Sequence, residues 1–94
     1  MNISELKKII EKNENGIVAE FDGLVEFKVE KMNSLKENFD IEGSMEFDEK
    51  NTLIYSLNFY NVDKDCEYDG IIGKIFNPSE EDIINLFNAD FIEL

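Results

Sequence analysis

Carboxylates are the chemical groups that this sequence offers in quantity. The chain has 22 Asp and Glu against 9 Lys, and it contains no His, Arg, Trp or Gln. Carboxylates alone can form the acid–base pair of a glycosidase or a Mg²⁺ site. Without His, however, no Cys–His or Ser–His arrangement can exist. A chain of 94 residues also leaves little room for a deep pocket beside its core. We therefore expect a protein that is not an enzyme and that needs no cofactor.

The length and the apolar content predict one domain that spans residues 1–94. A chain of this size buries roughly 60–70% of its unfolded surface, and 43% apolar residues, eight Phe among them, supply a core. Cys66 is the single cysteine, so an internal disulfide cannot form. The first residues carry charges within their apolar pattern, unlike a signal peptide, and no apolar run approaches the ~20 residues of a membrane span. We expect a cytoplasmic protein, in a bacterial cell or in the host cell of a phage.

The net charge of −13 excludes some partners and favours others. It lies far outside the roughly 2–8 charges usual for a small domain. Such a chain repels nucleic acids and anionic membranes, whereas it attracts basic proteins and speeds encounter with them. Lys, Asn and Ile, which have A/T-rich codons, are abundant. This composition is typical of a low-GC bacterium, its phage or another mobile element.

Periodicity predicts an α+β fold with an antiparallel sheet of about five strands. The expected order is helix, two strands, a short element, three strands and helix, with both helices packed on one face of the sheet. The expected elements are a helix over 2–13, strands over 17–22, 24–32, 41–47, 52–61 and 71–76, and a helix that begins after Ser79. Asn2 and Ser79 are the expected helix caps, and Asn15-Gly16 is the expected stop of the first helix.

Three connections carry local signals. Asp22-Gly23 is a strong signal for a two-residue turn, and the polar run from Asp48 to Asn51 predicts the turn of a second hairpin. Residues 35–39 fit one turn of helix or a plain loop, because Ser34 and Glu37 have capping-box spacing. In either case we expect Leu35 and Phe39 to anchor this segment to the core. Residues 63–70 are expected to form an acidic connection.

Strict alternation in the strands predicts an acidic face on the sheet. Seven carboxylates are expected to point outward together, with Lys28 as the one interruption of opposite charge: Glu20, Asp22, Glu26, Glu30, Glu42, Glu46 and Asp48. Two neighbouring rows of such carboxylates would approach the charge density of a nucleic-acid phosphate backbone. A charge run of this kind is usually a solvated face that keeps the protein soluble. Since like charges that face each other destabilise a sheet, a binding face is the other interpretation.

A second acidic group lies further along the chain. Asp63, Asp65, Glu67 and Asp69 cluster in the predicted connection, together with Tyr68, and Tyr60 falls on the acidic parity of the preceding strand. Exposed Tyr beside carboxylates is typical of binding hot spots. Residues 65–72 also match the first half of an EF-hand loop, but Glu67 stands where Asp or Asn belongs and Phe76 stands where a bidentate Glu is required. Calcium binding by the 63–70 segment is therefore a minor alternative.

These observations predict a small acidic binding protein. The expected function is inhibition of a basic partner, a nuclease or another nucleic-acid-binding protein, whose nucleic-acid site is blocked by imitation. In size, acidity and composition the chain resembles the small anti-CRISPR proteins as a group, although the resemblance covers no motif. A nuclease-toxin immunity protein follows from the same physics. The alternative from another class is a structural or assembly subunit that oligomerises through a sheet edge, for which a homodimer is possible.

Overall fold

The computed structural model describes residues 1–12 and 16–91 and has the α+β fold that the sequence predicts. Its helices are α1 (Ile3–Lys12), α2 (Glu80–Leu86) and the 3₁₀ helix η1 (Ala89–Phe91). Its strands are β1 (Gly16–Phe21), β2 (Leu24–Met32), β3 (Asn38–Phe47), β4 (Thr52–Asn61) and β5 (Cys66–Phe76). The expected stop at Asn15-Gly16 falls partly outside the described residues, while Gly16 begins β1.

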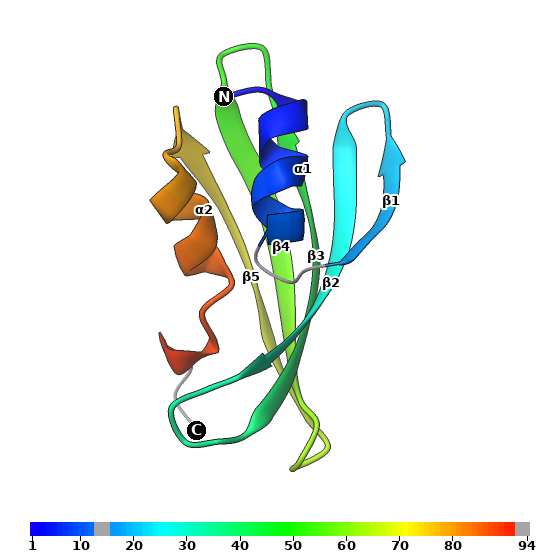
Figure 1. Cartoon of the computed structure of the whole chain (residues 1–94), viewed down its shortest axis with the longest axis vertical. Helices are drawn as coiled ribbons and strands as arrows, with labels where there is room; N and C mark the ends of the chain where they lie inside the picture. Colours follow the sequence, from blue (N-terminus) through cyan, green and yellow to red (C-terminus); the bar gives the residue numbers. More distant parts are fainter. Residues whose placement is uncertain (13–15, 92–94) are drawn as a thin grey trace.

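The five strands form one antiparallel sheet in the order β1-β2-β3-β4-β5, so each strand pairs with its neighbour in sequence (Figure 1). Asp22 and Gly23 both have positive φ, 48° and 83°, which is the backbone of the predicted two-residue turn. β2, β3 and β4 are the central strands. The two strands with the densest outward carboxylates, β2 and β3, are therefore neighbours.

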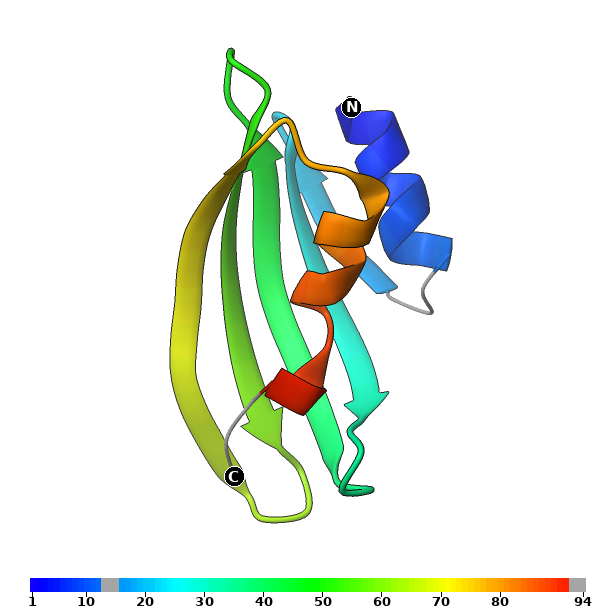
Figure 2. The same ribbon diagram turned by 90° about the vertical axis from the view of Figure 1, so that its left-hand side faces the viewer.

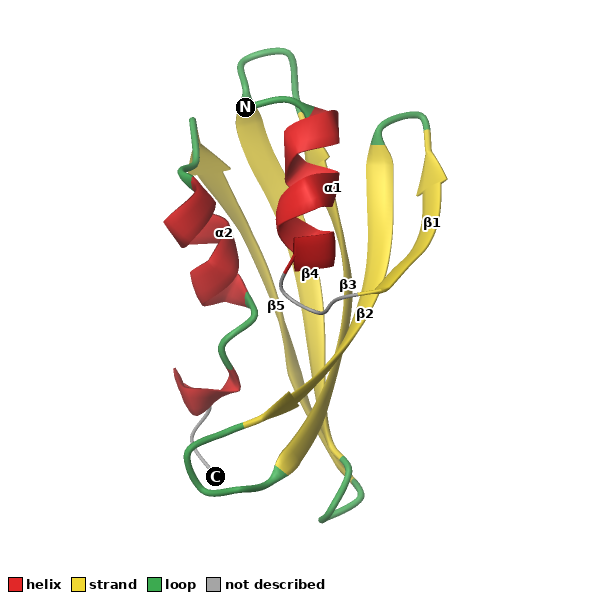
Figure 3. Cartoon of the chain, in the orientation of Figure 1, coloured by secondary structure: helices red, strands yellow, loops and turns green. Residues whose placement is uncertain are grey.

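Both helices lie on the same side of the sheet, and within residues 1–12 and 16–91 no helix lies on the other side, which we call the open face (Figures 1 and 3). Asn2 caps α1 through a 2.9 Å hydrogen bond from the Glu5 backbone N–H to its Oδ1. Ser79 caps α2 in a reciprocal capping box with Asp82. Side chains from both helices and from β2, β3 and β4 fill the space between the layers. Phe27 and Phe87 meet edge to face there, with ring centroids 5.1 Å apart.

The segment between β2 and β3 is a turn and not the short helix that capping-box spacing allowed. Asn33 is buried, and its Oδ1 accepts the backbone N–H groups of Leu35 and Glu37 at 3.0 and 3.1 Å. Lys36 adopts a positive φ of 60°, which no helix interior allows. Phe39 is buried as expected, but Leu35 is 65% exposed and anchors nothing.

The acidic connection expected over residues 63–70 is largely strand. β5 begins at Cys66, because Cys66, Glu67 and Tyr68 pair with Asn61, Tyr60 and Phe59 of β4. The register then shifts, so that Asp69 and Gly70 together oppose Asn58 before Ile71 pairs with Leu57. Only residues 62–65 form a turn. Residues 65–76 therefore do not form a calcium-binding loop. Successive side chains of a strand point to opposite faces, so the carboxylates of this segment cannot converge on one ion.

Candidate protein-binding surface

The open face carries most of the carboxylates that alternation assigned to it. Glu26 and Glu30 of β2 and Glu42 and Glu46 of β3 are all exposed there, as predicted. Asp40 of β3 joins them, although it was not among the expected site residues. Its signal was present in the sequence, since Phe39 and Ile41 alternate with Asp40 and Glu42, but the strand was expected to begin only at Ile41. These residues come from adjacent strands, about 4.8 Å apart.

One row across the sheet concentrates negative charge. Glu30 lies opposite Asp40, Asp40 lies opposite Tyr60, and Tyr60 lies opposite Glu67. Among the described residues, no ion pair involves Glu30, Asp40 or Glu67. We use the term acidic surface for this row together with the neighbouring turn residue: Glu30, Asp40, Tyr60, Asp65 and Glu67.

Tyr60 is the aromatic centre of the acidic surface. Its hydroxyl donates a hydrogen bond to Oδ1 of Asp65. This hydrogen bond, helped by partial desolvation and by the negative charges of Asp65 and Asp40, raises the pKa of Tyr60 above its ordinary value of 10.0. A groove of about 200 Å³ runs beside the ring, lined by Asp40, Glu42, Asn58, Phe59, Tyr60 and Glu67. Such a groove offers carboxylates and an aromatic face to a cationic side chain.

Two lysines limit the spread of this surface. Lys28 lies opposite Glu42, and its Nζ is 3.7 Å from Glu42 Oε1, which neutralises the middle of the β2–β3 rows. Lys74 of β5 lies opposite Ile54 on the same face and was not foreseen as an interruption. Glu26 and Glu46 are therefore separated from the acidic surface by a neutralised stretch, and the open face is not uniformly acidic.

Glu20 does not lie on the open face, which corrects the sequence prediction. The pairing of β1 with β2 shifts register between Ile17 and Ala19, so the side-chain alternation reverses within the strand. Glu20 pairs with the inward-facing Val25 and lies on the helix-covered side, where its Oε2 is 2.5 Å from Nζ of Lys7 in α1. This contact raises the pKa of Lys7, through the hydrogen bond first and then through the charge of Glu20.

Asp22 and Asp48 lie in turns instead of on the sheet face. Asp22 is exposed at the tip of the β1–β2 turn. Asp48 organises the β3–β4 turn, because its Oδ1 accepts the backbone N–H groups of Lys50 and Thr52 at 2.8 and 3.0 Å. The bond from Thr52, followed by that from Lys50, lowers the pKa of Asp48. This carboxylate is already engaged within the fold.

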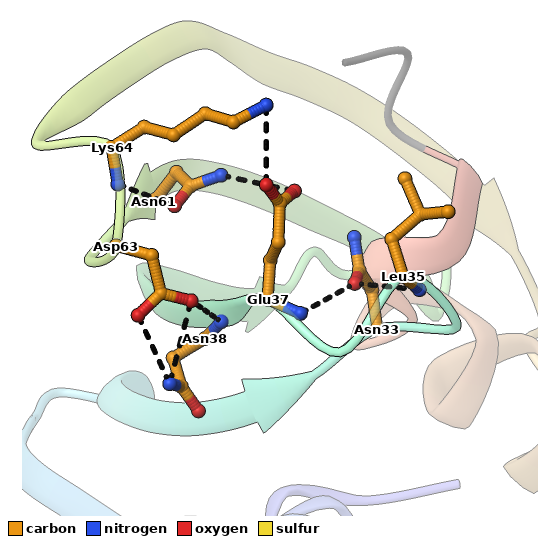
Figure 4. A network of polar contacts seen from close by, with 7 residues as sticks. All are labelled: Asn33, Leu35, Glu37, Asn38, Asn61, Asp63 and Lys64. Atoms are coloured by element: carbon orange, nitrogen blue, oxygen red, sulfur yellow. Dashed lines mark hydrogen bonds and ion pairs between the residues drawn. The ribbon is translucent and has the colours of Figure 1, made fainter.

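Asp63 belongs to a polar network that joins the β2–β3 turn to the β4–β5 turn (Figure 4). Its Oδ2 accepts the backbone N–H of Asn38 at 2.8 Å, which lowers the pKa of Asp63. The fully buried Asn61 accepts the backbone N–H of Lys64 at 3.0 Å. Glu37 joins the two turns, since its Oε1 lies 3.1 Å from Nζ of Lys64. The hydrogen bond to Glu37, followed by the negative charge of Glu37, raises the pKa of Lys64. The network fixes the turn that carries Asp65.

Two further residues of the expected second group are placed differently from the prediction. Tyr68 lies on the helix-covered side, half-buried, with its ring centroid 6.0 Å from that of Phe39. Asp69 is exposed at the bulge of β5. Of the second acidic group, only Asp65 and Glu67 therefore join Tyr60 in the acidic surface. In the part of the chain that the structure describes, no cluster of three or more Asp, Glu or Cys is arranged to hold a metal ion.

Comparison with known proteins supplies no relative from which a function could be transferred. No family model, no curated protein and no solved structure matches this chain. The helices that the structure describes are all too short or too polar to cross a membrane.

Proposed function

We propose that this protein is a non-catalytic inhibitor that binds the basic, nucleic-acid-binding surface of another protein. The observation that carries the proposal is the row Glu30–Asp40–Tyr60–Glu67, which crosses four strands on the open face of the sheet (Figure 2). We expect the partner to be a nuclease or another nucleic-acid-binding protein. The biological setting is either a mobile-element protein that blocks a host defence nuclease or an immunity protein that neutralises a nuclease toxin.

The spacing of these carboxylates supports imitation of a phosphate backbone. Along one strand, side chains on one face recur every ~6.6–6.8 Å, about twice the ~3.4 Å between phosphates of one DNA strand. Adjacent strands add further rows about 4.8 Å away. Because β2 and β3 are neighbours, Glu30 and Asp40 lie opposite each other, and together they approach the density that a phosphate-binding site expects.

The unpaired state of the row also supports a binding role. Like charges opposite each other cost about 0.2–1 kcal/mol per pair in a sheet, and Glu30 faces Asp40 with no ion-pairing Lys among the described residues. Lys28 has Glu42 within reach, so the chain does pair charges elsewhere on this face. A basic partner would relieve the repulsion and occupy the groove beside Tyr60.

Affinity capture from host lysate at low salt tests the proposal. The captured protein is expected to bind nucleic acid, to elute when a DNA or RNA oligonucleotide is added, and to be released by salt. The test variant is Glu30→Lys with Asp40→Lys. Glu11→Lys with Glu49→Lys is the matched control, since both of these carboxylates are exposed, lie in α1 and in the β3–β4 turn, and give the same change in net charge.

The two variants separate a site from general electrostatics. The proposal expects capture to be lost with the test variant and retained with the control. Equal loss in both variants would mean that net charge alone attracts the partner. Capture that survives the test variant, or a partner that nucleic acid does not displace, would remove the acidic surface as the site.

A further inference from the structure

β5 is a long edge strand. It has 11 residues, and in the part of the chain that the structure describes it pairs with β4 alone. In Figure 2 it forms the left margin of the sheet. The other edge strand, β1, has only 6 residues and is packed against by α1. A long edge with free N–H and C=O groups is a template for another strand.

The second half of β5 has apolar side chains on both faces. Ile72 and Phe76 lie on the open side and are 81% and 73% exposed. Ile71 and Ile75, on the helix-covered side, are only half-buried, whereas the residues opposite them on β4, Leu57 and Leu53, are at most 1% exposed. Strands that are apolar on both faces are normally interior strands. β5 therefore has the composition of an interior strand at the edge of the sheet.

We propose that β5 pairs antiparallel with β5 of a second copy of this chain, about a two-fold axis at Ile71. The bulge decides which residues face each other across this axis. Asp69 and Gly70 together take one position of the ladder, opposite Asn58. When Ile71 lies opposite Ile71 of the second copy, Tyr68 therefore comes opposite Gly73 and Glu67 comes opposite Lys74.

Every pair in this register matches in face. Tyr68 and Gly73 both lie on the helix-covered side, because their β4 partners are Phe59 and Tyr55. Glu67 and Lys74 both lie on the open side, opposite Tyr60 and Ile54. Without the bulge, an axis at Ile71 would bring Tyr68, and not Glu67, opposite Lys74.

Charge complementarity favours a second copy over an unrelated strand. The two-fold symmetry forms the Glu67–Lys74 pair twice. In the monomer the cross-strand neighbour of Lys74 is Ile54, whereas in the dimer Lys74 also has Glu67 of the second copy beside it. Ile71 packs on its own equivalent, and Ile75 comes opposite Cys66. The two sheets become continuous, and both acidic surfaces lie on the same side. This inference does not depend on the proposed function, but it shares Glu67 with the acidic surface, and in the dimer Lys74 of the second copy neutralises that carboxylate.

Sedimentation equilibrium of the full chain over micromolar to sub-millimolar concentrations tests the dimer. We expect a reversible dimer that tightens with added salt, because salt screens the repulsion between two chains of charge −13. Ile71→Lys places two like charges opposite each other at the axis and is expected to leave only monomer. Phe21→Lys is the control, since Phe21 is 76% exposed on the opposite edge and the change in charge is the same. A monomeric wild type, or equal loss in both variants, would overturn the proposal.

A charge swap tests the register. Glu67→Lys alone is expected to weaken dimerisation about tenfold, because the symmetry produces the like-charge contact twice. Glu67→Lys combined with Lys74→Glu restores the opposite charges and the original net charge, so the dimer is expected to recover. Dimerisation that is insensitive to Glu67→Lys, or that the swap does not restore, would overturn the axis at Ile71.

Discussion

Glu30 and Asp40 lie directly opposite each other on β2 and β3, on the open face, with no ion-pairing Lys among the described residues. The contact opposes folding and supports binding of a basic partner. Asp40→Asn is therefore expected to raise the free energy of unfolding by about 0.2–1 kcal/mol and to weaken binding to the captured partner. Urea unfolding and a binding titration at low salt measure the two effects.

Asp22→Asn is the matched control for this change. It removes the same charge from a turn tip, and Asn tolerates the positive φ of that position and forms the same turn with Gly23. We expect partner affinity to stay close to that of the wild type. If Asp22→Asn stabilised the protein and weakened binding as much as Asp40→Asn, both effects would come from net charge and not from the Glu30–Asp40 contact.

The hydrogen bond from Tyr60 to Asp65 predicts an alkaline titration. It raises the pKa of Tyr60 above 10.0, so its stabilisation is fully present below pH 10 and is lost as the pH rises through the folded-state value. Asp65→Asn, which suits the positive φ of 48° at this position, is expected to lower the pKa of Tyr60. The absorbance of tyrosinate against pH, with Tyr60→Phe subtracted to remove Tyr55 and Tyr68, measures the shift. An unchanged difference curve would contradict this contact.

Asp48 predicts an acid-side effect. Its pKa is lowered below 3.8, first by the backbone N–H of Thr52. The stabilisation is therefore present above pH 3.8 and is lost as the pH falls through the lower folded-state pKa. Asp48→Asn keeps an oxygen that accepts the same two N–H groups but cannot carry the charge that strengthens them.

Urea midpoints of wild type and Asp48→Asn across this pH range test that effect. The wild type is expected to be the more stable protein at neutral pH, and the gap is expected to close in acid. Taking the difference between variants removes the general relief of repulsion that acid gives to a chain of this charge.

The unbroken alternation of β2 and β4 made their faces predictable from sequence. Val25, Phe27 and Val29 are buried and Glu26 and Glu30 are exposed, as expected. The errors fall where one extra residue enters a strand. The shift between Ile17 and Ala19 moves Glu20 to the other face, and no local sequence signal marks it, because a bulge is a property of the pairing between strands.

The start of β5 was unpredictable for a related reason. Asp, Glu and Gly have low strand propensity, so the sequence of residues 66–70 predicted a loop between two strands. β4 extends to Asn61 and offers a template with which Cys66, Glu67 and Tyr68 pair. Tertiary pairing overrides local propensity here, and it is this extension that brings Glu67 beside Tyr60. The acidic surface is thus only partly visible in the sequence.

Gly43 of β3 leaves no room for a side chain against β4. It lies on the helix-covered side opposite Leu57, and a Cβ there would lie 2.1 Å from the Ser56 carbonyl oxygen and 2.9 Å from Leu57 Cδ2. Gly43→Ala is therefore expected to destabilise the protein by about 1–3 kcal/mol, which thermal unfolding would record as roughly 4–8 °C per kcal/mol for a chain of this length.

Gly16→Ala is the matched comparison, since the nearest atom to its Cβ is the Lys28 carbonyl oxygen at an ordinary 3.6 Å. There the loss of unfolded-state freedom should stabilise the protein by about 0.4–1 kcal/mol. Gly43 is the chain neighbour of Glu42, whose side chain lies on the open face. Gly43→Ala is therefore also expected to disturb the groove that Glu42 lines beside Tyr60. A Gly43→Ala protein as stable as Gly16→Ala would contradict this close approach of the two strands.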